Sequence, residues 1–307
     1  MKLIKNSIVL ALTSIITLPT FAANIDLYGR ANVSLQSSDE GEGRFSEMNS
    51  NASRIGFKGI HELNDSVDVV YQAEFQVDID GDAEDVFTGR NQFIGLRGGF
   101  GEVLLGKNDS ILKQSQGKMD LFSDYNGDIK VLWKGENRLS NTVTYKSPKF
   151  SYFQLAATYI VADSVEADDA ISIAAFYGDK NLKKSQIYAA LAYDAEVKDY
   201  DIVRATVQGK VADVTLGLIL HNQKAVDTAA EMDGVMVSAK YTTGETTFKG
   251  QYQIADHKGG EKNSGISAGV DYKLAKSTKV YAFYTSFDLK TEDKDTDHLA
   301  VGIQYEF

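Results

Sequence analysis

Strict alternation of apolar and polar residues at both ends of the chain constrains its fold more than any other feature. The apolar set near the C-terminus is Leu299, Val301, Ile303, Tyr305 and Phe307. The matching set near the N-terminus is Ile25, Leu27, Gly29, Ala31, Val33 and Leu35, with polar residues between them. A strand of this kind shows one face to lipid and the other to water. Because neither edge can stay unpaired in hydrocarbon, the two strands are predicted to close a transmembrane barrel.

The first 22 residues have the pattern of a secretory signal peptide, so we predict a leader at 1–22 and a barrel domain at 23–307. Lys2 and Lys5 form a basic region, an apolar core spans 8–18, and a small-residue cleavage site ends at Ala22. The apolar run is too short to cross about 30 Å of hydrocarbon as a helix, which argues against a retained anchor. We therefore predict Sec-dependent export, with the membrane crossed by strands.

Sixteen segments have the pattern of amphipathic strands, and the connections between them alternate in length. The strands are predicted at 24–36, 53–61, 67–77, 90–97, 102–108, 138–146, 150–160, 170–178, 185–193, 201–209, 212–221, 233–241, 246–254, 264–273, 278–288 and 297–307. Short turns are predicted at 62–66, 98–101, 147–148, 179–184, 210–211, 242–245 and 274–277. Longer, acidic loops are predicted at 37–52, 78–89, 109–137, 161–169, 194–200, 222–232, 255–263 and 289–296. This pattern is typical of an all-β, 16-stranded antiparallel barrel with short periplasmic turns, long outer loops and both chain ends in the periplasm.

Composition and charge limit the functions open to such a barrel. The chain has no Cys, which excludes disulfides and thiolate metal sites, and removal of Lys2 and Lys5 takes its formal charge from −11 to −13. A strongly acidic chain disfavours nucleic acid as a partner and suits an outer surface that holds divalent cations. A barrel of about sixteen strands encloses an aqueous channel rather than a packed core, so its size indicates transport.

The longest loop and a set of inward basic residues form the candidate site. The loop at 109–137 mixes charged and aromatic residues that suit folding into the lumen, and the alternative is an outer surface loop. Basic residues fall at lumen-facing positions of neighbouring strands: Arg30, Arg54, Arg90, Arg138 and Lys58. Charges at these positions are costly anywhere but in a water-filled cavity. The pattern therefore favours a channel with one basic side.

Several local motifs along the mature chain match one family. They are Asp26-Leu27-Tyr28-Gly29-Arg30, Arg54-Ile55-Gly56-Phe57-Lys58-Gly59, Phe93-Ile94-Gly95-Leu96 followed by Gly98-Gly99-Phe100-Gly101, Gly106-Lys107, Arg138-Leu139-Ser140-Asn141 and the terminal Tyr305-Glu306-Phe307. In these motifs the chain resembles the trimeric general diffusion porins of Gram-negative outer membranes. The resemblance covers essentially the whole mature chain and is strongest over its first half.

The resemblance implies that the third loop folds into the barrel and that its carboxylates face the arginines at the narrowest point. The enterobacterial members carry a Pro-Glu-Phe-Gly-Gly-Asp run in this loop. This chain has Met119-Asp120-Leu121-Phe122-Ser123-Asp124-Tyr125-Asn126-Gly127-Asp128 instead. We expect Asp120, Asp124 and Asp128 to form the acidic side.

The resemblance also implies the partners of the protein. They are two further copies in a homotrimer latched by the second loop at 78–89, and outer-membrane lipid with lipopolysaccharide. During assembly, Tyr305 and Phe307 are expected to be read by the barrel-insertion machinery.

Two other patterns resemble chemical sites and are interpreted as structural. Gly265-Ile266-Ser267-Ala268-Gly269 matches the nucleophile elbow of hydrolases, but it lies inside an alternating strand, so no enzyme is predicted. Asp78–Asp82 and Asp293–Asp297 space carboxylates as calcium loops do, yet lack the closing glutamate in the expected register. We predict no cofactor and no dedicated metal site, with weak Ca²⁺ or Mg²⁺ on acidic loops as the alternative.

The leading interpretation is a passive, water-filled diffusion porin for small hydrophilic solutes and ions, with a mild cation preference. A substrate-selective porin is the alternative, and an ordered aromatic track would indicate it. The inward aromatics that would form such a track are Tyr28, Tyr152, Phe176, Tyr188 and Tyr281. A third hypothesis is a plugged barrel that acts through its outer loops as an adhesin or phage receptor.

Overall fold

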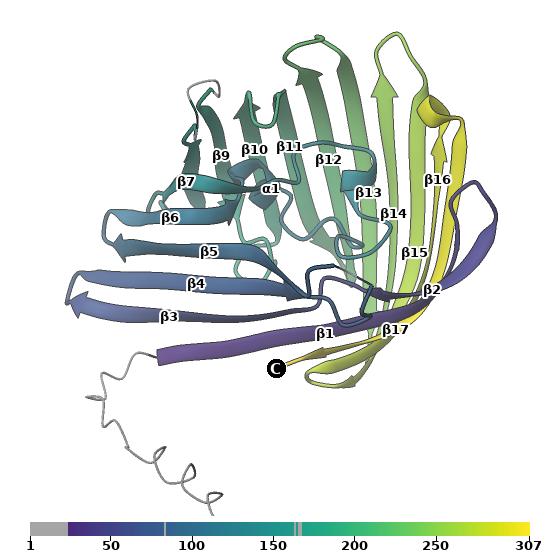
Figure 1. Cartoon of the computed structure of the whole chain (residues 1–307). Helices are drawn as coiled ribbons and strands as arrows, with labels where there is room; N and C mark the ends of the chain where they lie inside the picture. Colours follow the sequence, from purple (N-terminus) through teal and green to yellow (C-terminus); the bar gives the residue numbers. More distant parts are fainter. Residues whose placement is uncertain (1–23, 83, 163, 165–167) are drawn as a thin grey trace, which may run out of the picture.

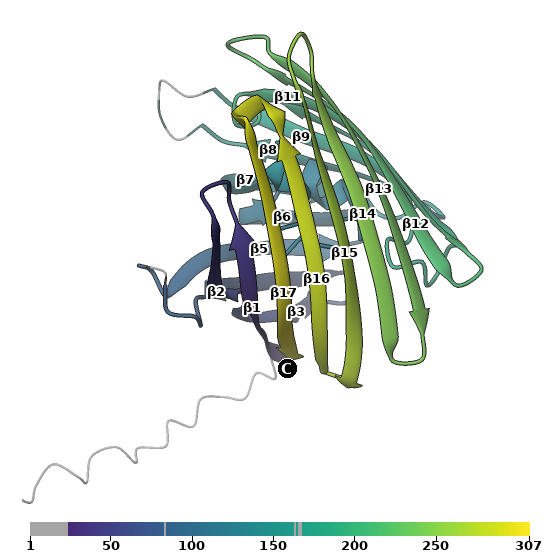
Figure 2. The ribbon, with the colours of Figure 1, turned by 90° about the vertical axis from the view of Figure 1, so that its right-hand side faces the viewer.

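The protein is an antiparallel sheet that closes on itself around a wide lumen (Figures 1 and 2). The computed structural model describes residues 24–307 except 83, 163 and 165–167, so the predicted signal peptide lies outside the described residues. The strands are β1 (Asn24–Asp39), β2 (Arg44–Ser50), β3 (Arg54–Asn64), β4 (Val67–Val77), β5 (Phe87–Gly98), β6 (Gly101–Asp109), β7 (Arg138–Lys146), β8 (Phe153–Ile160), β9 (Ala170–Gly178), β10 (Ile187–Ala195), β11 (Tyr200–Val211), β12 (Val214–Ala225), β13 (Glu231–Thr243), β14 (Thr246–His257), β15 (Lys262–Ala275), β16 (Thr278–Leu289) and β17 (Lys294–Glu306). The helical segments are α1 (Ile111–Ser115), η1 (Ile129–Val131) and η2 (Lys290–Glu292).

The first and last strands pair, which confirms the predicted closure of the barrel. Val33 of β1 lies opposite Ile303 of β17, and the two strands run antiparallel. Phe307 extends the ladder by one step, since its backbone N–H donates to the Gly29 carbonyl at 3.1 Å. The Phe307 ring occupies the space that a Cβ on Gly29 would need, so a side chain at this position would displace the ring.

The second strand of the barrel is interrupted, so that seventeen segments make sixteen strands. Both β2 and β3 pair with β1, β3 along its first half and β2 along its second. Between them, Asn51 is buried and donates through Nδ2 to the Ser34 and Tyr281 hydroxyls at 2.8 and 3.1 Å. Ala52 adopts a positive φ of 51°. Side-chain hydrogen bonds thus supplement the backbone bond from the Asn51 N–H to the Asn32 carbonyl at this kink.

Several outer loops are shorter than the sequence predicts. The expected loop at 37–52 is mostly strand, because β1 extends to Asp39 and β2 begins at Arg44. The expected loop at 255–263 likewise shrinks, and Lys262 pairs with Asp256 at 2.7 Å across the hairpin. Charged residues that suggest a loop in the sequence therefore form cross-strand ion pairs in strands that project beyond the apolar band.

The predicted strand at 150–160 begins only at Phe153, and the turn before it is correspondingly longer. The short turns lie at the end of the barrel that holds Asn24, the first described residue, and the C-terminus, and we call it the short-turn end (Figure 1). We call the opposite end the outer end. No helix among the described residues is long and apolar enough to cross a membrane.

The protein core lies inside the barrel, between the third loop and the inner wall. Lipid-facing side chains along β10, such as Leu191, are exposed, whereas the alternating inward residues Tyr188, Ala190 and Ala192 are buried. They are buried because the loop at 110–137 lies over them, and α1 is visible within the ring of strands in Figure 1. The predicted entry of the third loop into the lumen is confirmed.

Candidate functional site

The third loop begins with a short helix seated on a row of alanines. The Ser110 hydroxyl caps α1 by accepting a hydrogen bond from the Lys113 backbone N–H at 3.1 Å. Ile111 and Leu112 are completely buried against the inner wall. The residues beneath them are register partners on β8, β9 and β10, namely Ala156, Ala174 and Ala192. Their small side chains leave room for the helix.

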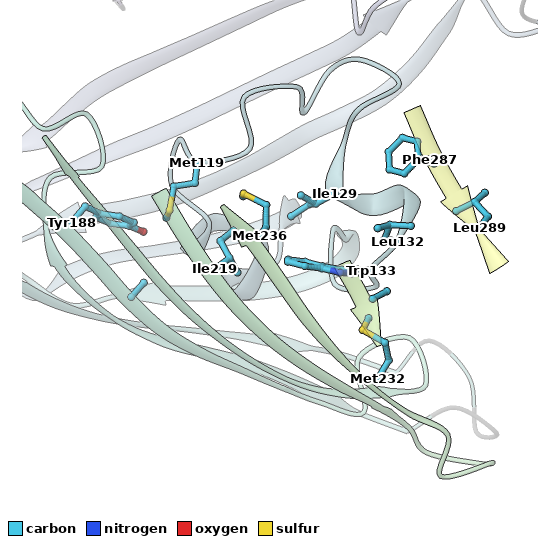
Figure 3. Close-up of a cluster of buried hydrophobic side chains, with 12 residues drawn as sticks. Met119, Ile129, Leu132, Trp133, Tyr188, Ile219, Met232, Met236, Phe287 and Leu289 are labelled. Carbon is cyan, nitrogen blue, oxygen red and sulfur yellow. The ribbon is translucent and has the colours of Figure 1, made fainter. Parts of the chain in front are cut away.

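Trp133 anchors the second half of the loop. Its ring stacks on His221 of β12 at a centroid distance of 4.9 Å, and its Nε1–H donates to the Ile254 carbonyl at 3.0 Å. The ring also lies against Gly234 of β13, where any side chain would collide with it. The rest of the apolar cluster joins loop and wall (Figure 3), with Met119, Ile129 and Leu132 from the loop and Ile219, Met232 and Met236 from the wall.

A buried ion pair fixes the end of the loop. Arg204 of β11 is completely buried, and its guanidinium contacts the Glu136 carboxylate at 2.6 Å and the Lys134 carbonyl at 3.3 Å. Loss of either partner would leave a buried charge unpaired, which is strongly unfavourable. The pair therefore holds the loop's return to β7 in one position. We call the inner faces of β8 to β16, which bear these contacts, the loop-bearing wall.

Asp124 reaches from the loop to the opposite side of the barrel. Its carboxylate contacts the Arg30 guanidinium at 2.5 Å and the Arg54 guanidinium at 3.3 Å. These arginines project from β1 and β3, so the loop crosses the lumen at this level. Lys58 lies nearer the short-turn end of β3, where its Nζ is 5.1 Å from the centroid of the Tyr28 ring. It does not border the space around Asp124.

Arg90 and Arg138 continue the basic row on β5 and β7, but carboxylates of the wall pair with them. Arg90 contacts Glu74 of β4 at 2.5 Å, and Arg138 contacts Asp109 of β6 at 3.1 Å. Glu74 and Asp109 were not among the residues predicted for the site. The register carries the signal that was missed, since Asp109 lies directly opposite Arg138 in the ladder. We call the inner faces of β1 and β3 to β7 the arginine wall.

Asp120 and Asp128 bond mainly within the loop, although Asp120 also accepts from Gln251 Nε2 of β14 at 3.2 Å, and among the described residues neither forms an ion pair with an arginine. Asp120 accepts hydrogen bonds from the backbone N–H groups of Phe122 and Ile129, both at 3.0 Å. Asp128 caps η1 by accepting from the Lys130 N–H at 2.8 Å. Burial and then the charge of Asp128 raise the pKa of Asp120 to about 8, and burial raises the pKa of Asp128 to about 6. These two carboxylates shape the loop, whereas Asp124 makes the contact expected of all three.

Two cavities meet at the loop. The outer cavity has a volume of about 880 Å³ and borders Arg54, Arg90 and Arg138. The inner cavity, toward the short-turn end, has a volume of about 640 Å³ and borders Lys210 and Lys240. The loop residues that border both are Lys118, Asp120, Ser123, Asp124 and Tyr125. The geometry is that of a water-filled lumen narrowed at mid-height by a loop that is rigidly packed on one wall.

The other sequence patterns find structural places. Ser267 is buried inside β15, away from any strand-to-helix turn, and its hydroxyl hydrogen-bonds the Thr285 hydroxyl. Within the described part of the chain, no group of three or more His, Asp or Glu side chains is placed to hold a metal ion. Weak binding of Ca²⁺ or Mg²⁺ by the acidic loops stays a prediction.

The chain is similar to known outer membrane proteins over most of its length. A family model described as Gram-negative porin matches residues 7–305. A major outer membrane protein P.IB of Neisseria meningitidis serogroup B is 25% identical over 261 residues, which are 83% of this chain and 72% of that protein. An anion-selective porin from Comamonas acidovorans has a TM-score of 0.75 at 19% identity, covering 93% of this chain and 100% of that one. The trimer form of OmpT, an outer membrane protein of Vibrio cholerae, has a TM-score of 0.70 at 17% identity, covering 93% and 99%.

Proposed function

This chain belongs to the Gram-negative porin family and is a multi-pass channel protein of the outer membrane, and we propose that its selectivity is set where the third loop crosses the lumen. The resemblance seen in the sequence is thereby confirmed. The proposed constriction has Arg30, Arg54, Arg90 and Arg138 on one side and the loop segment 116–124 on the other. Small hydrophilic solutes and ions pass between the two cavities at this level.

The contact of Asp124 with Arg30 and Arg54 is the observation that carries this proposal. It joins the loop to the opposite wall, so every solute must pass beside it. Glu74 and Asp109 belong to the same site, because they pair with the remaining arginines and partly neutralise them. Opposed charges in the narrow part of a pore favour small polar solutes over apolar ones, because only polar solutes replace lost hydration there.

A substrate-selective porin with an aromatic track is less well supported. Tyr188 is buried under the loop and donates to the Ser115 carbonyl at 3.0 Å, and Phe176 packs against the same apolar clusters. Tyr281 is buried beside Tyr125, with ring centroids 5.0 Å apart. Three of the five inward aromatics therefore serve the core rather than a path for solutes.

Conductance in planar bilayers tests the proposed function. We expect ohmic single-channel steps in KCl that are lowered by neutral solutes small enough to enter the lumen and unaffected by larger ones, because a diffusion channel sieves neutral solutes by size. Saturable block by one class of sugar would support a selective porin instead. A purified, folded barrel that conducts no ions would contradict the proposal.

We also propose a homotrimer as the working assembly. The solved OmpT trimer form supports it through the shared fold, and the acidic loop at 78–86 is the segment proposed to contact a neighbouring subunit. A heat-sensitive oligomer on native gels is expected. A stable monomer with full conductance would contradict the trimer and leave the channel intact.

Assembly is proposed to depend on the terminal aromatic residues. The rings of Tyr305 and Phe307 stack at a centroid distance of 6.0 Å on the outside of the closing strand. Deletion of Phe307 is expected to leave unfolded material in the periplasm, whereas Phe153→Ala, at an equally exposed outer aromatic, is expected to assemble normally. Equal surface levels of the two variants would reduce the terminal residue to ordinary lipid-facing packing.

A further inference from the structure

The inner cavity has more positive charge than its own carboxylates compensate. The basic residues that line it are Arg30, Lys118, Lys180, Lys183, Lys210, Lys240, Lys249 and Lys279, and the acidic ones are Asp120, Asp124, Asp213 and Asp271. Asp124 is engaged by Arg30, and Asp271 is shared by Lys249 and Lys279 at 3.0 and 2.8 Å. Within the described residues, the remaining five lysines have no carboxylate within 4.0 Å. We call Lys118, Lys180, Lys183, Lys210 and Lys240 the lysine ring.

Three lysines of the inner cavity lie at one level of the barrel, on β11, β13 and β14. Thr215 of β12 is the register partner of Lys210 on β11 and of Lys240 on β13. Lys240 is in turn directly opposite Lys249 of β14. Like charges directly opposite each other destabilise a sheet, and neighbouring strands are only about 5 Å apart. A barrel that needed only a wet lumen would be more stable with neutral polar residues at these positions.

The remaining members of the lysine ring come from the loop and from a folded turn. The turn at 179–186 is longer than the other short turns, and Leu182 packs against the apolar cluster that anchors the loop. The Asp179 carboxylate accepts hydrogen bonds from the Asn181 and Lys183 backbone N–H groups at 2.9 and 3.1 Å. Asp179 is thus occupied by the backbone of the turn, and Lys180 and Lys183 line the cavity without it. Lys118 borders the cavity from the loop.

We propose that the lysine ring binds small oxyanions that carry three or more closely spaced negative charges, such as oligophosphates or tricarboxylates. This inference rests on the proposed channel function and adds a binding site on its short-turn side. Lysines on strands about 10 Å apart, as Lys210 and Lys240 are, match a ligand whose charges are spread over several atoms better than a single monovalent ion. The ligand would be held just below the constriction, where it would slow its own passage and that of other anions.

Block of the KCl current by added anions tests the proposal. In 0.1 M KCl, where screening acts over about 10 Å, pyrophosphate and citrate are the probes and acetate at equal ionic strength is the monovalent control. The concentration of pyrophosphate or citrate that halves the current is expected to be at least about tenfold lower than that of acetate. Block is expected to be stronger when the anion is added from the short-turn side. Raising KCl to 1 M is expected to abolish the difference, because the screening length falls to about 3 Å.

A double variant isolates the lysines. Lys210→Gln with Lys240→Gln is expected to raise the half-blocking concentration of pyrophosphate about tenfold relative to the variant's own unblocked current. Lys224→Gln with Lys290→Gln is the matched control, because both residues lie away from the inner cavity. Lys224 is exposed near the outer end of β12, and Lys290 of η2 pairs with Asp288 of β16. The current through this control variant is expected to be blocked by the same pyrophosphate concentration as the current through the natural chain. Native-gel migration reports assembly, and the single variant Lys240→Gln replaces the pair if the pair assembles poorly.

The outcomes separate this inference from the proposed function. Equal block of the natural chain by acetate and pyrophosphate, or equal block of the natural chain and the lysine variant, would overturn the lysine ring while the channel stands. A chain that forms no channel in KCl alone would overturn the proposed function, and pyrophosphate binding would then be measured by ³¹P line broadening on the detergent-solubilised barrel. A preference for pyrophosphate over citrate, or the reverse, would identify which oxyanion class the site takes.

Discussion

The two inner walls of this barrel are built from the same kind of alternating strand, but their inward residues have different surroundings. On the arginine wall, inward residues are charged and paired, as Arg90 is with Glu74, and they face water. On the loop-bearing wall, inward residues such as Ile219 and Met236 are completely buried under the third loop. The inward face of a barrel strand is therefore largely charged where it borders the channel, and under the loop it carries large apolar residues beside a few buried polar ones such as Arg204. Where a loop lies on it, the same face becomes a protein core.

The comparison explains why the loop stays in place in a channel filled with water. Apolar burial on one wall supplies most of the stabilisation, because removing such surface from water is favourable in proportion to its area. The ion pair of Asp124 with Arg30 is partly exposed and contributes less. The loop is therefore held mainly by its apolar contacts with the loop-bearing wall, and Asp124 at its tip can interact with solutes.

The largest effect is expected from Trp133→Ala, which removes the main anchor from the loop-bearing wall. Replacement of a buried Trp by Ala typically costs about 3–5 kcal/mol. We expect a lower unfolding temperature in detergent, together with noisier and larger single-channel currents as the loop detaches. Tyr241→Ala, at an outward and partly exposed position of β13, serves as the control. Unchanged currents in the Trp133 variant would show that the apolar wall does not hold the loop.

The next effect tests the arginine wall. Arg54→Ala with Arg90→Ala widens the passage and leaves the Glu74 carboxylate without its two arginine partners. We expect a higher conductance and a reversal potential in a KCl gradient that shifts toward cation selectivity. Arg97→Ala, which breaks an exposed pair with Asp68 near a short turn, is the control. If the double variant and the control give the same reversal potential, the arginines do not line the narrowest part.

A smaller effect separates the loop carboxylates. Asp124→Asn removes a charge at the tip and is expected to shift the reversal potential toward anions. Asp128→Ala removes the side chain that caps η1 and is expected to lower the unfolding temperature with little change of selectivity, because Ala cannot replace the cap. If the Asp128 variant shifted the reversal potential and the Asp124 variant lowered the unfolding temperature, the buried side of the loop would face the solute path.

The last effect is a dependence of stability on pH. The pKa of Asp120 is raised by burial to about 8, above the value of about 3.9 that an unfolded Asp shows. Between these values the folded chain binds a proton that the unfolded chain has released, so stability falls as pH rises from about 4 to about 8. We expect the unfolding temperature to drop over this range and Asp120→Asn to flatten the curve. Asp213→Asn, in a short turn, is the control and is expected to keep the natural dependence of the unfolding temperature on pH. If Asp120→Asn kept the same dependence, other groups would be responsible for it.

Much of the site was accessible from the sequence, because the two-residue period of a strand is a local property. The two-residue period placed Arg30, Arg54, Arg90 and Arg138 on the inward face, and it predicted that the first and last strands pair to close the barrel. The sequence also contained a signal that went unused. Strands of the loop-bearing wall have apolar residues on both faces, as in Val235, Met236 and Val237, which indicates that something covers the inner face.

Local alternation by itself determined the barrel, its closure and which residues face lipid, since these follow from the chemistry of each strand and its two environments. Only the tertiary structure decided which carboxylates meet the arginines. Asp124 does and Asp120 and Asp128 do not, because the path of the loop is set by distant contacts such as Trp133 on His221. Ion pairs across a lumen depend on the placement of whole segments, and no spacing along the chain encodes that placement.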